Sequence, residues 1–132
     1  MGTHCSIHVK ENYGDNTPYL MIYTQFDGYF SGVGKNIKLK FANHQIVDGY
    51  NSSNTMENTA NGIGCFAAQL VAHLKTRIGN IYIENSEQIE SYHYVLYCRD
   101  NKIYISASIN SEEMYNGPLC DFNYDMEDET IL

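Results

Sequence analysis

Residues 62–79 read GIGCFAAQLVAHLKTRIG, and this stretch carries the strongest structural signal in the chain. Apolar side chains recur in it at intervals of three and four residues, which is the period of an α-helix. They form one continuous stripe: Ile63, Phe66, Ala67, Leu70, Val71, Leu74 and Ile78. The stretch predicts an amphipathic helix from about Gly62 to Ile78 whose apolar face packs against a core.

The residues that flank this helix predict where it begins and ends. The Asn61 side chain can accept a backbone N–H of the first turn. Lys75 and Arg77 fall in the expected last turn, where the helix dipole favours positive charge. Gly79 follows at the position where a glycine commonly ends a helix.

The rest of the chain is predicted to be mainly β-strand. Residues 3–10 alternate between apolar and polar side chains, which predicts a half-buried strand. Apolar and aromatic runs predict further strands at Tyr19–Phe26, Ile81–Ile83, Tyr92–Cys98 and Ile103–Ile109. Turn-forming residues separate the first two strands and the last two, so we expect each of these pairs to form a hairpin.

Three shorter segments complete the expected fold. Residues 37–41 favour a short helix over an irregular strand, and the polar residues 49–61 favour a surface loop. Leu119–Phe122 is expected to form a final short strand or extended segment. Because strands that directly follow one another tend to pair as hairpins, the sheet should be largely antiparallel. The expected fold class is therefore α+β, with about five strands and with one long and one short helix packed on one face.

Length and composition indicate a single folded domain inside the cell. The 132 residues fit one domain, and 43% hydrophobic with 18% charged residues is typical of a folded chain. We expect the domain to span residues 1–124 and an acidic C-terminal tail to span 125–132. Four widely spaced cysteines form no C-x-x-C pair, and the N-terminus lacks the apolar region of a signal peptide. These features predict an intracellular protein with reduced thiols.

The charge distribution narrows the classes of partner. The formal net charge is −8, and residues 84–132 alone hold 2 basic and 11 acidic side chains. Such an acidic surface repels phosphate backbones, so we expect no direct nucleic-acid binding. No run of 18 apolar residues is available to span a membrane. The spacing of histidine and cysteine suggests no metal site, and we expect no cofactor.

A glycine-rich segment after the second expected strand is a candidate anion site. Residues 28–36, GYFSGVGKN, are similar to a phosphate-binding loop, but the spacing is one residue too long and the magnesium-binding Ser or Thr is missing. What remains is a turn at Gly32 and Gly34, preceded by Asp27 and followed by Lys35. Its backbone N–H groups could face an anion, and the alternative is a purely structural turn.

The long helix supplies the other candidate residues. Gly62 and Gly64 fit the spacing of a dinucleotide fingerprint, but they follow a polar loop where that motif requires a strand, so only their free N–H groups remain a candidate anion site. Cys65, Gln69 and His73 align on one flank of the helix. Because eight residues separate Cys65 from His73 by about 12 Å, a direct catalytic hydrogen bond is out of reach. The flank either packs against the sheet or a partner, or holds a thiol activated from elsewhere.

Three parts of the chain resemble one protein family. They are Met1-Gly2-Thr3, the turn Phe26-Asp27-Gly28-Tyr29 with Ser31-Gly32-Val33-Gly34, and residues 62–75 followed by Gly79-Asn80-Ile81-Tyr82. Together they resemble a family of small uncharacterised proteins of phages and large DNA viruses. Members often carry Trp in place of Phe26 and Arg in place of His4, which puts binding through those two side chains in doubt. The resemblance implies a viral accessory role and carries over no activity.

Three functions follow as hypotheses. The leading one is a non-enzymatic viral accessory protein, a homo-oligomer that binds a host or viral protein and could counteract host defence. The second is a protein that binds a small anion or sequesters a nucleotide through the turn at Gly32 and Gly34 and the helix start at Gly62 and Gly64. The third is a small hydrolase that uses Cys65 or His73.

Overall fold

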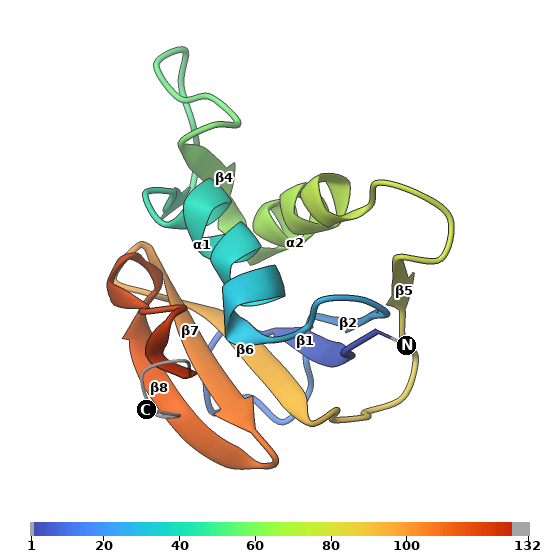
Figure 1. The fold of residues 1–132 in the computed structure, drawn as a ribbon. Helices are drawn as coiled ribbons and strands as arrows, with labels where there is room; N and C mark the ends of the chain where they lie inside the picture. Colours follow the sequence, from blue (N-terminus) through green and yellow to red (C-terminus); the bar gives the residue numbers. More distant parts are fainter. Residues whose placement is uncertain (1, 128–132) are drawn as a thin grey trace.

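The structure is a computed structural model that describes residues 2–127. Both helices cover the same face of one sheet (Figure 1). In chain order the elements are β1 (Cys5–Val9), β2 (Leu20–Thr24), the π-helical turn η1 (Phe30–Gly34), α1 (Lys35–Phe41), β3 (Gln45–Val47), β4 (Thr59–Asn61), α2 (Gly62–Leu74), β5 (Ile81–Ile83), β6 (Tyr92–Arg99), β7 (Lys102–Ile109), β8 (Glu112–Pro118) and the 3-10 turn η2 (Leu119–Asp121).

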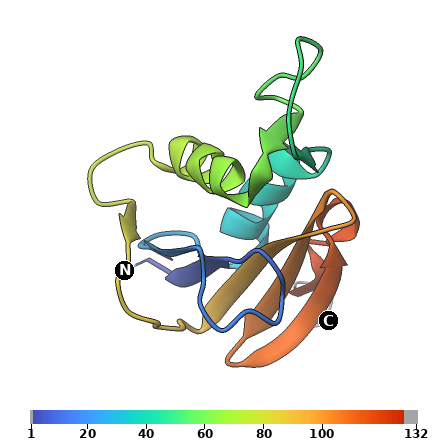
Figure 2. The same cartoon turned by 180° about the vertical axis from the view of Figure 1, so that it is seen from behind.

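The sheet is mixed and curls like half a barrel (Figures 1 and 2). Its strand order is β4-β3-β7-β6-β1-β2-β5, and β8 pairs with β7 beside this path. β1 runs parallel to β6 and β3 runs parallel to β4, whereas the other pairs are antiparallel. The N-terminal strand therefore lies in the middle of the sheet.

The fold class predicted from the sequence is wrong in strand number and helix length, and it misses the two parallel strand pairs. Within residues 2–127 eight strands replace the expected five, and the helices have 13 and 7 residues. β3 and β4 have three residues each, and β8 reads EEMYNGP, so none of the three has a clear apolar pattern. The parallel pairing of β1 with β6 joins residues 87 positions apart, and local turn signals do not predict such a pairing.

The core lies between the helices and the concave side of the sheet. The predicted stripe of α2 is confirmed from Ile63 to Leu74, where every stripe residue except the half-buried Val71 is buried. α1 and the inward faces of β1, β6 and β7 contribute further buried side chains, among them Ile37, Phe41, Cys5, Ile7, Val9, Tyr94, Leu96, Ile103 and Ile105.

α2 ends four residues earlier than predicted. The backbone becomes extended at Lys75, whose ψ is 105°. Asn80 Nδ2 then donates to the Leu74 carbonyl oxygen at 2.6 Å, so a side chain from beyond the helix satisfies its last turn. Ile78, the expected end of the apolar stripe, is 100% exposed.

The expected capping residues have other contacts. Asn61 stands at the N-cap position but makes no side-chain cap, because its Oδ1 accepts the Gly49 N–H at 2.8 Å. Gly79 has a φ of +85°, but it lies in the turn before β5 and not at the end of α2. Lys75 and Arg77 lie beyond the helix as well, and so they do not sit in its last turn.

β1 is buried on both faces, although its alternating sequence predicted a half-buried strand. Ser6 and His8 are only 3% and 4% exposed. Residues 84–90 run over this face, and the Glu90 N–H donates to Ser6 Oγ at 2.9 Å. β1 is a central strand, and the connecting residues 84–90 cover its polar face. Its polar side chains are therefore buried, whereas a strand with one open face would expose them.

Several local predictions are confirmed and others are corrected. The short helix over residues 37–41 is α1, and the β6–β7 hairpin turns at Asp100 and Asn101, whose φ values are 53° and 63°. Leu119–Asp121 form a 3-10 turn in place of the expected strand or extended segment, with only Phe122 extended, and β4 lies within the expected loop 49–61.

The predicted acidic tail is described only at its start. Met126 packs against the core, and residues 128–132 lie outside the described residues. Within residues 2–127, neither helix has the length and apolar character needed to cross a membrane.

Candidate functional site

A polar groove of about 320 Å³ lies between the turn after β2 and the chain after α2. Residues 24–36 form one wall, and residues 74–81 form the other. Asp27 and Arg77 are the charged side chains that line it, and we name it the Asp27–Arg77 groove. Two stretches distant in sequence therefore meet at one concave site.

Local contacts hold the turn at Asp27 in one conformation. Asp27 has a φ of +58°, and its carbonyl oxygen accepts the Val33 N–H at 2.8 Å. The Tyr29 hydroxyl donates to Asp27 Oδ1 at 3.1 Å, and this carboxylate raises the pKa of the Tyr29 phenol. The Asp27 carboxylate is thus positioned at the groove and keeps acceptor capacity for a ligand, because a carboxylate has about four lone-pair sites.

Arg77 lies on the opposite wall. Its guanidinium carbon is 4.9 Å from the ring centre of Phe26, a distance typical of a cation–π contact. Among the described residues it forms no ion pair with a carboxylate. A guanidinium binds phosphate or carboxylate groups through parallel N–H donors, and those of Arg77 pair with no carboxylate within residues 2–127.

Two amide side chains also line the groove. Asn36 Oδ1 lies 2.8 Å from His73 Nε2, which links α1 to α2. Asn80 Nδ2 donates to the Leu74 carbonyl, whereas Asn80 Oδ1 is buried without a hydrogen-bond partner among the described residues. A buried acceptor without a partner is costly, and a ligand N–H could satisfy it.

The groove therefore combines a cation and a carboxylate, and the unpartnered amide oxygen of Asn80 is buried in its wall. Arg77 suits an anionic group, and the Asp27 carboxylate suits N–H donors. Ligand pockets commonly start at about 300 Å³, so the volume is sufficient for a small molecule. This chemistry fits a small anion that also carries N–H donors.

The glycine turn does not present its backbone to an anion as the sequence suggested. The Gly32 and Val33 N–H groups donate to the carbonyls of Tyr29 and Asp27 at 2.9 and 2.8 Å, so both are used within the turn. Gly34 is buried, and a Cβ there would lie 3.1 Å from the Phe122 ring. These two glycines permit close packing.

Lys35 also lies away from the Asp27–Arg77 groove. Its Nζ is 5.5 Å from the centre of the Tyr124 ring, near the C-terminal end of the described chain. Of the candidates around the glycine turn, only Asp27 and Gly32 line the groove. The groove's cation is Arg77, which sequence reasoning assigned to the end of a helix.

The candidates at the start of α2 belong to a different site. Cys65 and Gln69 line a second groove of about 360 Å³, which we name the loop groove because Tyr50 and Met56 of the protruding loop also line it (Figure 1). Gly62 has a φ of +85°, which favours glycine there.

Gly64 packs beside Tyr19, whose hydroxyl a Cβ would approach to 2.6 Å. Because the Asp27–Arg77 groove lies at the other end of α2, where Leu74 lines it, the two glycine segments do not form one site.

Cys65 and His73 have different partners, as their spacing on the helix predicted. Gln69 Nε2 lies 3.7 Å from Cys65 Sγ, and His73 Nε2 lies 2.8 Å from Asn36 Oδ1. No histidine hydrogen bond to Cys65 occurs among the described residues. The third hypothesis, a hydrolase, gains no nucleophile–base pair from these two residues.

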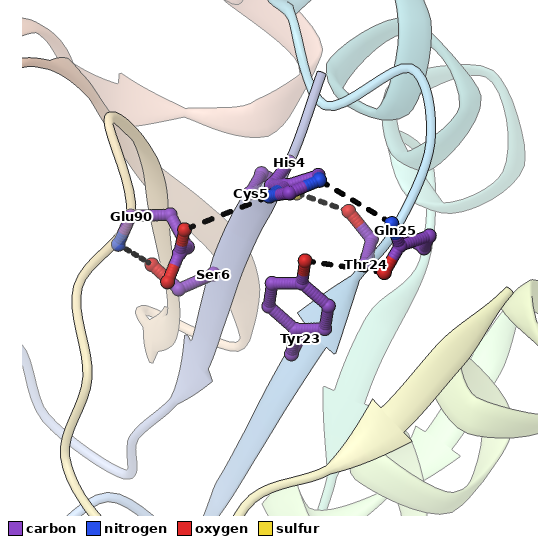
Figure 3. Close-up of polar contacts among 7 residues, drawn as sticks. All are labelled: His4, Cys5, Ser6, Tyr23, Thr24, Gln25 and Glu90. Atoms are coloured by element: carbon purple, nitrogen blue, oxygen red, sulfur yellow. Dashed lines mark hydrogen bonds and ion pairs between the residues drawn. The ribbon is translucent and has the colours of Figure 1, made fainter. Parts of the chain in front are cut away.

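A hydroxyl–imidazole pair that the sequence did not suggest occurs elsewhere. Ser6 Oγ lies 2.7 Å from His93 Nδ1 and also accepts the Glu90 N–H, and Figure 3 shows Ser6 and Glu90 with their neighbours. Burial lowers the pKa of His93 to about 4, so its imidazole is neutral at pH 7. The adjacent cavity holds about 10 Å³, room for roughly one water. Ser6 and His93 are only 3% and 8% exposed, so a substrate cannot reach this pair.

The same cluster connects the ends of neighbouring strands. His4 Nδ1 lies 4.0 Å from Glu90 Oε1, and His4 Nε2 lies 3.3 Å from Gln25 Nε2 (Figure 3). Cys5 Sγ lies 2.7 Å from Thr24 Oγ1 on the other face of β1. These contacts fix residues 84–90 and the end of β2 to β1, which is a structural role.

The comparisons with known proteins add no relative. No family model, no curated protein and no solved structure matches the chain. Within residues 2–127, no group of three or more histidine, cysteine, aspartate or glutamate side chains is placed to hold a metal ion. The Asp27–Arg77 groove is therefore assigned from its geometry alone.

Proposed function

We propose that the protein is a non-enzymatic binding protein whose Asp27–Arg77 groove takes a small anion that carries N–H donors. The observation that carries this proposal is the placement of Asp27 and Arg77 in one groove without an ion pair between them. Unpaired opposite charges that face the same cavity favour a ligand with complementary groups at both ends. Arg77 binds the anionic group, and Asp27 accepts from the donors.

Nucleoside monophosphates have this chemistry, and guanosine monophosphate is the best-matched probe. Its phosphate suits the guanidinium of Arg77, and its ring N–H and exocyclic amino groups are donors for the Asp27 carboxylate. The two walls of the groove also belong to the parts of the chain that carry the viral resemblance, around Phe26-Asp27-Gly28-Tyr29 and Asn80-Ile81-Tyr82. This proposal thus keeps the ligand class of the second hypothesis, a small anion or nucleotide, and replaces most of the residues that were expected to bind it.

Thermal shift with guanosine monophosphate tests the proposal. At about ten times Kd, a ligand that binds only the folded state should raise the melting temperature by about 4–6 °C. Arg77→Ala should abolish this rise because it removes the cation. Arg99→Ala is the matched control, since Arg77 and Arg99 are the only arginines of the chain and Arg99 lies outside the groove.

Two results would count against it. The wild-type protein would show no shift at millimolar nucleotide, or Arg77→Ala and Arg99→Ala would reduce the shift equally. Equal reduction would mean that binding depends on net charge and not on the groove.

Binding of another protein at the loop groove is a second candidate, and it retains the leading hypothesis from the sequence. Tyr50 and Met56 are 71% and 63% exposed at this groove, and tyrosine and methionine are enriched in protein interfaces. The viral setting of such a role rests on the resemblance alone. A host or viral protein, or a second copy of the chain, would then lie against residues 50–56.

The loop-groove candidate predicts a residue-specific loss of binding. Tyr50→Ala combined with Met56→Ala should weaken capture of a partner by about tenfold or more, because two exposed anchors are removed. Leu39→Ala is the control, as Leu39 is 67% exposed on α1 and does not line the groove. Quantitative pull-down and light scattering measure a partner and self-association respectively. Equal effects of the two variants would contradict this candidate.

A further inference from the structure

A third groove, of about 520 Å³, shares no residue with the two grooves described above. It lies beside the face of β6 and β7 that points away from the helices, because Leu96 and Ile105 face the core and their neighbours Tyr97 and Tyr104 point outward. We name it the tyrosine groove. Its main side chains are Asn12, Tyr13, Tyr97, Arg99, Tyr104 and Asn116.

The three tyrosines form one continuous aromatic surface. The ring centres of Tyr13 and Tyr97 are 5.2 Å apart, and those of Tyr97 and Tyr104 are 5.5 Å apart. Tyr97 is the floor, being 6% exposed, whereas Tyr13 is 44% exposed and reaches the surface. The aromatic rings of the groove thus extend from the buried Tyr97 to the exposed Tyr13.

Hydrogen bonds hold two of these rings in place. The Tyr13 hydroxyl donates to Glu113 Oε2 at 2.6 Å, and the Tyr97 hydroxyl donates to Asn116 Oδ1. Ser106 Oγ also donates to Glu113 Oε2, which fixes the carboxylate. Rings that are already ordered lose little conformational entropy when a ligand stacks on them.

Polar groups around the rings remain free to bind a ligand. The Arg99 guanidinium carbon lies 5.8 Å from the centre of the Tyr104 ring, and Arg99 forms no ion pair among residues 2–127. Within the same residues, the Tyr104 hydroxyl and the Asn12 side-chain amide make no hydrogen bond. Donors and acceptors therefore surround the aromatic surface.

The charges near the groove favour a neutral ligand. Arg99 already lies within cation–π distance of the Tyr104 ring, and its positive charge would repel a ligand cation. Burial raises the pKa of Tyr97, and of the charged groups that act on this phenol Arg99 lowers its pKa whereas Glu113 raises it. The acidic residues 84–132 also disfavour a phosphate polymer. The groove therefore presents aromatic rings that are surrounded by free polar groups and carry little net charge.

We propose that the tyrosine groove binds a neutral sugar ring of an oligosaccharide. The C–H face of a pyranose packs on the Tyr104 and Tyr13 rings by the hydrophobic and dispersion contacts that aromatic side chains supply. The hydroxyl groups of the sugar accept hydrogen bonds from the Arg99 guanidinium. They also exchange hydrogen bonds with the Asn12 side chain and the Tyr104 hydroxyl. No bond is made or broken, so the activity is recognition alone.

Saturation-transfer NMR and calorimetry with maltotriose, cellotriose, mannotriose and chitotriose test this proposal. At least one trisaccharide should bind with a Kd of about 0.1–5 mM. Tyr104→Ala should weaken binding about tenfold or more, and Tyr104→Phe should weaken it less because the ring remains. Tyr19→Ala and Arg77→Ala are controls that remove an exposed tyrosine and an arginine outside the groove, and they should leave the Kd unchanged.

Each alternative result would overturn the proposal. One is the absence of binding by all four trisaccharides at about ten times the weakest expected Kd. Another is that Tyr104→Ala keeps the wild-type melting temperature and binds the trisaccharide with the same Kd as the wild-type protein. If Tyr104→Ala does not fold, Arg99→Ala decides, because it removes free donors at the surface and should weaken binding. Arg77→Ala acts only on the Asp27–Arg77 groove. A failure of sugar binding at the tyrosine groove can therefore be distinguished from a failure of nucleotide binding at the Asp27–Arg77 groove.

Discussion

Gly28→Ala is expected to lower the free energy of unfolding by about 2–3 kcal/mol, because the position has no room for a methyl group. A Cβ at Gly28 would lie 2.6 Å from the backbone carbonyl carbon of His4 and 2.7 Å from the Cβ of Cys5. Hydrogen bonds fix the glycine on both sides: its N–H donates to the Thr3 carbonyl, and its carbonyl accepts the Tyr94 hydroxyl at 2.7 Å. The backbone of β1 would have to move.

Gly14→Ala is the matched control, since a Cβ there meets nothing within 4 Å. It should be neutral or slightly stabilising, because it reduces the freedom of the unfolded chain. Urea denaturation at pH 7 measures both variants. Equal stability of the two would show that the turn after Asp27 is not packed against β1 as described, and the position of the Asp27–Arg77 groove would then be in doubt.

Acidification from pH 6.5 to about 4 is expected to lower the free energy of unfolding by about 2–3 kcal/mol through His93. Burial, and then His8 and Lys10, lower the pKa of this histidine from 6.5 to about 4. The imidazole lies 4.6 Å from that of His8, and burial lowers the pKa of His8 in the same direction.

The sign follows from where the proton binds. Below pH 6.5 the unfolded chain takes up a proton at His93, whereas the folded chain does not until about pH 4. The stabilisation is therefore complete above pH 6.5 and is lost as the pH falls toward 4. Protonation would disturb the contact of the imidazole with Ser6, and residues 84–90, whose Glu90 N–H donates to Ser6 Oγ, would separate from β1.

His93→Gln should flatten this pH dependence, because an amide can still bond Ser6 and does not titrate. His4→Gln is the control, since the His4 side chain is 40% exposed. Urea denaturation at pH 7, 5.5 and 4.5 provides the measurement. An unchanged slope in His93→Gln would show that other groups govern acid unfolding.

The sequence predicted those features that depend on local pattern. The stripe from Ile63 to Leu74 and the turn at Asp100 and Asn101 are set by residue spacing and turn chemistry, and both are confirmed. The predicted end of α2 was wrong because the Asn80 side chain, which lies outside the helix, donates to the Leu74 carbonyl and so satisfies the last turn. β8 was missed because EEMYNGP pairs with β7 through its backbone and carries no apolar alternation.

The candidate site was only partly predictable for the same reason. Asp27 stood out because a turn signal follows a strand, but Arg77 gained its role only when the chain after α2 folded back beside Phe26. The pairing of Ser6 with His93 depends on the parallel register of β1 and β6 across 87 residues. Non-local pairing of this kind leaves no motif in the sequence.

The central claim is that residues 24–36 and 74–81 form one ligand site. Titration of guanosine monophosphate into isotope-labelled protein, followed by amide NMR, tests it most directly. We expect saturable shifts at Asp27, Gly32, Asn36, Arg77 and Asn80, and no comparable shifts in the loop groove or the tyrosine groove. Shifts confined to another surface, or none at millimolar nucleotide, would contradict the account.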